Sequence, residues 1–139
     1  MAEQLNWKCD VQVAGGPAIA AAGMQIVDAY SKSQIVVPGG TTGTPGTIVL
    51  NIDLTGASIL IVRASRYVDT ENPDQKLQYT VTDGGGAGTA TDLRGPLFMI
   101  GETTVGLLGS SVESLTFANS MTAAVTIDTL VGLDATPTP

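Results

Sequence analysis

The residues that could carry out chemistry are few in this chain. Among its 139 residues there is no histidine, and Cys9 is the only cysteine. Neither a Ser-His-Asp nor a Cys-His arrangement can therefore form, and the commonest zinc ligands are missing. Without a base to activate its thiol or a second cysteine to pair with, Cys9 is expected to be a small buried hydrophobe near the start of a strand.

Two loops hold the remaining candidates for a bound ligand. Asp69, Glu71 and Asp74 could surround calcium, although their spacing is not that of an EF-hand and Pro73 favours a plain solvated turn. The segment 83–88 is rich in glycine, but no Lys-Ser/Thr pair follows it, so a hairpin loop is favoured over a phosphate cradle. Paired-carboxylate glycoside hydrolysis is formally open to a chain with 13 acidic residues, but the aromatic platforms of sugar sites are scarce. We expect no enzyme, no catalytic residue and no cofactor.

The charge balance disfavours two classes of partner. Thirteen acidic and six basic residues give a net charge of −7, and the basic residues form no run. Such a chain repels phosphate backbones and anionic membranes, and no apolar stretch approaches the length of a bilayer span. The first residues show no secretory signal. We expect no nucleic-acid partner, no membrane, and assembly in cytoplasm.

The elements that must position these residues are short strands. Polar and apolar residues alternate, as in strands with one buried face, in three segments: 7–13, 48–54 and 77–81. Residues 24–37 are expected to form two strands around a polar turn at 31–33, and 103–108 one more strand. No amphipathic helix is evident. Eight or nine short strands predict an all-β fold, an antiparallel β-sandwich with jelly-roll-like topology.

The clearest pairing is expected near the end of the chain. Segments 110–118 and 123–133 both alternate, and only the short link Asn119–Met121 separates them. A short link favours an antiparallel hairpin, whose buried face requires a second layer. We expect a core that contains Leu50, Ile52, Ile59, Ile61, Leu115, Phe117, Val125 and Ile127.

The continuous apolar run at 58–63 lacks a polar face, which is typical of a strand covered on both sides. We expect it in the middle of a sheet, with a second subunit as a candidate cover. Arg63, Arg66 and Tyr67 follow this run, either as an interface anchor or as a solvated strand end.

Three regions are expected: an N-terminal arm at 1–23, a sandwich domain at 24–134 and a tail at 135–139. Glycine and proline flank the alanine-rich part of the arm, which suits a mobile or partner-clamped segment or a single helical turn. Mean hydropathy is +0.26 without a membrane span, so we expect a homo-oligomer, preferably a trimer, in which the arm crosses to a neighbour. The alternative is a leader before an ordinary monomer. The expected self-association residues are Trp7, Ala18, Ile19, Ala20, Arg63, Arg66 and Tyr67.

Two segments carry a resemblance to a known group. Gly56–Arg63, and the stretch from Arg94–Ile100 through Gly109–Ile127, together resemble the small β-sandwich structural proteins of tailed bacteriophage virions, such as capsid cement or decoration proteins and head-fibre or tail-knob domains. The resemblance covers about the C-terminal two-thirds and transfers no functional residue. It implies a non-enzymatic virion protein in many copies, with the major capsid protein or another virion protein as partner. The alternative is a receptor-binding or carbohydrate-binding module of a fibre or tail.

Overall fold

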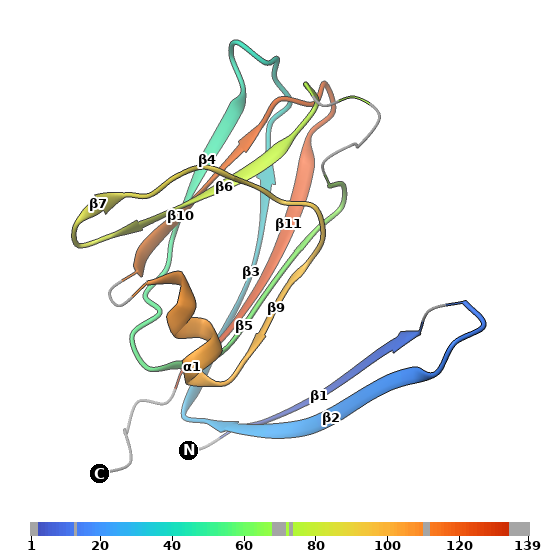
Figure 1. The fold of residues 1–139 in the computed structure, drawn as a ribbon. Coiled ribbons are helices and arrows are strands. Elements are labelled where there is room, and N and C mark those ends of the chain that lie inside the picture. Colours follow the sequence, from blue (N-terminus) through green and yellow to red (C-terminus); the bar gives the residue numbers. More distant parts are fainter. Residues whose placement is uncertain (1–2, 13, 68–71, 73, 110–111, 134–139) are drawn as a thin grey trace.

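A computed structural model of the chain describes residues 3–12, 14–67, 72, 74–109 and 112–133 (Figure 1). Val13, the calcium candidates Asp69 and Glu71, and the predicted tail at 135–139 lie outside the described residues. Along the described chain the elements are β1 (Glu3–Gln12), β2 (Ala18–Val27), β3 (Ala29–Val37), β4 (Gly46–Asn51), β5 (Ala57–Ala64), β6 (Leu77–Asp83), β7 (Gly86–Ala87), β8 (Thr91–Asp92), β9 (Leu97–Ile100), the one-turn helix α1 (Glu102–Val105), the 3-10 turn η1 (Gly106–Leu108), β10 (Val112–Asn119) and β11 (Val125–Leu133).

Strands β3 to β11 form two antiparallel sheets that pack face to face. One sheet has the order β3-β11-β5-β9, and the other has the order β4-β10-β6-β7, with β8 also paired to β6. From β3 to β6, and again from β9 to β11, each strand is followed by a strand of the other sheet. The predicted all-β antiparallel sandwich is therefore confirmed. Strands β1 and β2 form a separate two-stranded hairpin that projects from one end of the body (Figure 1).

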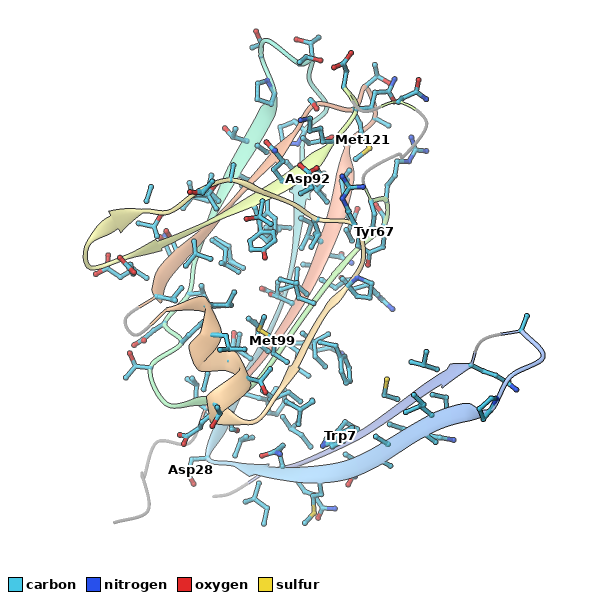
Figure 2. The ribbon with its side chains drawn as sticks, in the orientation of Figure 1. Trp7, Asp28, Tyr67, Asp92, Met99 and Met121 are labelled. Atoms are coloured by element: carbon cyan, nitrogen blue, oxygen red, sulfur yellow. The ribbon has the colours of Figure 1, made fainter. Side chains whose placement is uncertain are left out.

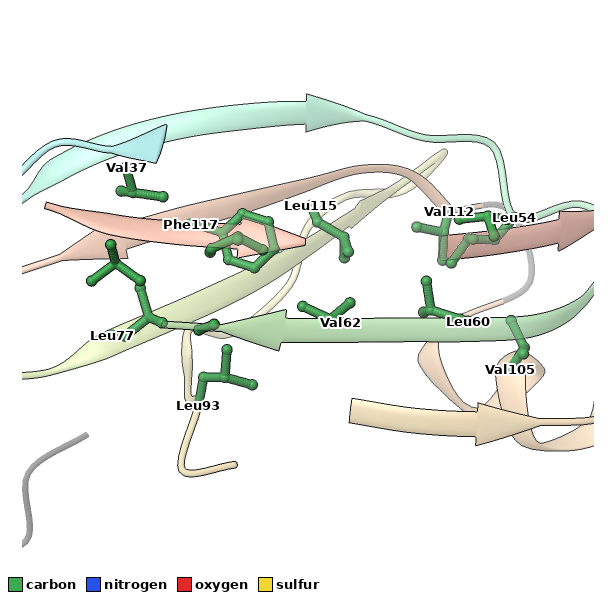
Figure 3. Packing of buried hydrophobic residues seen from close by; sticks show 14 of the residues in the cluster. Val37, Leu54, Leu60, Val62, Leu77, Leu93, Val105, Val112, Leu115 and Phe117 are labelled. Carbon is green, nitrogen blue, oxygen red and sulfur yellow. The ribbon is translucent and has the colours of Figure 1, made fainter. Parts of the chain in front are cut away.

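The core lies between the two sheets, and its buried members are aliphatic apart from Phe117 and Met121 (Figure 3). Phe117 and Leu115 of β10 are fully buried against Val125 and Ile127 of β11 and other strands, as expected. Leu50 of β4 and Ile52, just beyond that strand, are half-buried at its margin. Ile59 is buried as expected and Ile61 is half-buried, but both alternate with Leu60 and Val62 and therefore lie on the outer face of β5, not between the sheets. On β5 this alternation points Leu60, Val62 and Ala64 into the core, and Ala57 at the start of the strand also belongs to the core cluster.

The predicted C-terminal hairpin is wrong. β10 pairs with β4 and β6 in one sheet, whereas β11 pairs with β3 and β5 in the other. The link between them crosses the sandwich at Asn119, whose side chain is fully buried. Asn119 Nδ2 donates to Ala123 O at 2.9 Å, and Asn119 Oδ1 accepts from Met121 N at 2.9 Å. By crossing, each strand gains two neighbours in its own sheet and presents its apolar face to the other strand.

Two further expectations fail for local reasons. The predicted turn at 31–33 lies inside β3, which runs unbroken along β11; the break comes instead at Asp28, whose N–H donates to Leu133 O at 2.9 Å. The predicted strand at 103–108 is α1 and η1, where Val105 is buried below β5. Apolar spacing over so few residues does not separate a turn of helix from a strand.

Candidate self-association surface

The N-terminal arm is a regular antiparallel hairpin. Ten residue pairs join β1 to β2, from Glu3 opposite Val27 to Gln12 opposite Ala18. Alternation places Leu5, Trp7, Cys9 and Val11 of β1 on the same face as Val27, Gln25, Gly23, Ala21 and Ile19 of β2. We call this the inner face of the arm, since its base contacts the body. The outer face of the arm combines polar β1 residues with Ile26, Met24, Ala22, Ala20 and Ala18.

A glycine of the body holds the base of the arm. Gly132 lies on the outer face of β11 and is buried, with Leu5, Val27 and Ile59 gathered above its Cα. A Cβ at Gly132 would stand 3.0 Å from Leu5 Cδ1 and 2.9 Å from Val27 Cγ1. Because Gly132 has no side chain, these two residues of the arm pack directly on the backbone of β11. Val27 and Ile59 are both almost completely buried here. At Ile59, the outer face of β5 is thus covered by the arm of the same chain, where a second subunit was a candidate cover, whereas Ile61 is half-buried and Arg63 is exposed.

Beyond its base the arm leaves the body, and its apolar side chains lose their cover (Figure 1). On the inner face, Val11 is 57% exposed and Ile19 is 73% exposed, whereas Val27 at the base is fully buried. On the outer face, Ile26 is 61% exposed. Of the predicted residues, Ala18, Ile19 and Ala20 fall on β2 and are all exposed.

Trp7 lies on the inner face, about midway along the arm (Figure 2). Its ring rests on Gly23 of the opposite strand, where a Cβ would come within 2.7 Å of Trp7 Cζ2. Trp7 Nε1 is buried by this contact and has no hydrogen-bond partner among the described residues. A buried indole N–H without an acceptor costs free energy. The hydrogen-bond donor of Trp7 is therefore unsatisfied among the described residues of the single chain.

The outer face of sheet β3-β11-β5-β9 is mixed in character. Register aligns Leu130 of β11 with Ile61 of β5 and Phe98 of β9, and Phe98 is 41% exposed. The next row is polar: Asp128 accepts from Arg63 Nη2 at 2.9 Å and from Gln34 Nε2 at 2.8 Å.

The three residues of the predicted interface anchor at the end of β5 lie in different environments. Arg63 pairs with Asp128 within the chain, and these two hydrogen bonds from Arg63 and Gln34 lower the pKa of Asp128 below its ordinary value of 3.8. Tyr67 packs against the core, and its hydroxyl accepts from Ala64 N at 3.1 Å. Arg66 is exposed. Arg63, Arg66 and Tyr67 thus lie on the body, away from the arm residues with which they were grouped.

Three further features of the described part of the chain concern metal ligands, the thiol and helix length. There, no three side chains of Cys, Asp or Glu gather in a way that could hold a metal ion. Cys9 is half-buried on the inner face of the arm as a free thiol. The described helices, α1 and η1, are too short to cross a membrane.

Comparisons of the chain with protein-family models, with curated proteins and with solved structures find no match.

Sequence reasoning missed the strand character of 18–27. The signal was present, because nine of these ten residues are apolar or glycine and only Gln25 is polar. The short alanine side chains and the flanking glycines hid it.

Proposed function

We propose that this chain is a non-catalytic structural subunit that self-associates through its N-terminal arm. The observation that carries the proposal is the arm itself, a regular hairpin held at its base by Gly132 while Val11, Ile19 and Ile26 are left open to solvent. An isolated two-stranded hairpin is marginally stable in water, and exposed apolar side chains in one place are typical of interaction sites.

The specific form of this proposal rests on the resemblance to phage virion proteins. In that form the chain is a cement or decoration protein of a capsid, with copies of itself and the major capsid protein as partners. A sandwich body with a gripping arm suits such a role, because a contact through both body and arm raises the effective concentration of each.

Light scattering after size-exclusion chromatography tests self-association. We expect the full chain to be oligomeric, and Ile19→Asp to shift it toward the monomer by placing a charge on the arm. Val49→Asp is the matched control, since Val49 lies on β4 of the body and is 55% exposed. A full chain that is monomeric at every concentration, or equal dissociation by both variants, contradicts the proposal.

The virion role is tested separately by the composition of purified particles. A cement protein is present in a large, fixed copy number in the mass spectrum. A scarce protein that binds glycans would instead support the receptor-binding alternative.

A further inference from the structure

Strand β2 has the composition of a strand in the middle of a sheet but the position of an edge. Its ten residues include no charge, and Gln25 is the only polar side chain. Strands of this kind are ordinarily covered on both faces and paired on both sides. In the arm, β2 pairs only with β1, and eight of its residues are exposed.

The free edge of β2 invites a further strand. A long, uncharged, apolar edge presents a row of unpaired N–H and C=O groups, and natural proteins usually block such edges with charge, proline or a bulge. Within 18–27 there is no charged residue and no proline, and the ten pairs with β1 run without a register shift. The edge of β2 is therefore left open for pairing.

Charge indicates which chain pairs there. Copies with a net charge of −7 repel one another over most of their surface. Most of the arm is an exception: β2 is uncharged, and in β1 Lys8 Nζ lies 3.4 Å from Asp10 Oδ2, so these two charges offset each other. The remaining charge of β1, Glu3, lies opposite Val27 at the base of the arm. A second copy presents the same uncharged edge, which makes a self-complementary contact about a two-fold axis natural.

We propose that β2 of one copy pairs antiparallel with β2 of a second copy, so that two arms form one four-stranded sheet in the order β1-β2-β2-β1. This inference rests on the proposed self-association and specifies its contact. A two-fold axis perpendicular to the sheet passes near Ala22 or Gly23, at the middle of the strand. Ala22 keeps the outer face flat there, while the Trp7 ring lies over Gly23 on the inner face. The larger Ile19 and Ile26 lie toward the ends, where they meet residues of the partner strand.

Hydrogen exchange of the full chain tests the pairing directly. In a lone hairpin every second amide of β2 points away from β1 and exchanges quickly, whereas in a four-stranded sheet both sets are protected. We expect continuous protection along the middle of β2 at high concentration, and loss of protection at alternate residues on dilution. Alternating protection in the associated protein overturns this inference and leaves self-association intact. Continuous protection in a monomer, independent of concentration, overturns it in favour of an arm folded on its own body.

A charge at the two-fold axis provides a second readout. Ala22→Glu puts a carboxylate beside Lys8 in its own hairpin, which favours the hairpin, but close to its own copy across the axis. We expect the dimer Kd to rise about two- to fivefold at low salt and to recover at high salt. Ala18→Glu is the control, because Ala18 lies on the same face at the far end of the strand, opposite Gln12.

Self-association and the edge pairing of β2 can be refuted by different results. A full chain that stays monomeric overturns both. Equal effects of Ala22→Glu and Ala18→Glu on an associating protein overturn only the edge pairing. Edge pairing joins copies in twos, so a trimeric mass also overturns it while supporting self-association.

Discussion

Replacing Gly132 by alanine tests how the arm is attached. The added methyl would stand 2.9 Å from Val27 Cγ1, 3.0 Å from Leu5 Cδ1 and closer still to Ile59 Cγ2. Leu5 can rotate its terminal methyl away, but Val27 and Ile59 are β-branched and stiff at χ1. We therefore expect the base of the arm to lift from β11.

The expected loss follows from two opposing effects. Overpacking a filled site costs about 1–3 kcal/mol, and replacing glycine by alanine within a strand returns about 0.5–1 kcal/mol. The net change in the free energy of unfolding is a loss of about 0.5–2 kcal/mol. In a chain of this size, a loss of 1 kcal/mol lowers Tm by about 2–5 °C.

Urea unfolding followed by two signals measures the effect. Circular dichroism reports the whole molecule, and the fluorescence of Trp7, the only tryptophan, reports the arm. Gly84→Ala is the control, because a Cβ there meets no atom within 4 Å. Equal stability of Gly132→Ala and the parent, with unchanged Trp7 emission, would refute the contact at the base of the arm.

Three further changes probe the body. Phe117→Ala should cost about 3–5 kcal/mol in urea unfolding, because the ring is fully buried; a loss below about 1 kcal/mol would contradict the packing. Asn119→Ala should cost about 1–3 kcal/mol by leaving Met121 N and Ala123 O without their partner, whereas Ser120→Ala at the rim should cost less. The pKa of Asp128 is lowered in the folded state by its hydrogen bonds from Arg63 and Gln34, so its contribution is present above about pH 3.8 and is lost as pH falls through the lower folded value. The difference in urea midpoint between parent and Asp128→Asn should therefore shrink from pH 6 to pH 3, and a constant difference would count against this reasoning.

Local alternation was enough to predict several strands and the class of fold. Leu77, Tyr79 and Val81 follow one another at the period of β6, and the run at 58–63 correctly indicated a central strand. Whether a segment forms a strand can be read locally, because one buried face makes apolar and polar residues alternate within that segment.

Pairing is not local, and there the sequence misled. Asn119-Ser120 looks like a hairpin turn, but its role depends on Val37 and Pro38, which supply carbonyls to the buried amide from across the sandwich. The polar residues at 31–33 look like a turn, but Ser33 on β3 reaches Thr129 of β11 and stays in the strand. These contacts join residues more than 80 positions apart, so no short window contains them.

The position of the candidate site follows from how the chain distributes its apolar surface. A strand without a polar face needs two covers, and both β5 and β2 are such strands. The core covers one side of β5, and the arm covers Ile59 on the other side because Gly132 leaves room for Val27 and Leu5. Having used its base to cover β5, the arm leaves Ile19 and Ile26 of β2 without cover in the same chain. The apolar surface without cover therefore lies on the arm. In the proposed pairing, β2 of a second copy satisfies the free backbone edge of both strands and places partner side chains beside Ile19 and Ile26 along that edge.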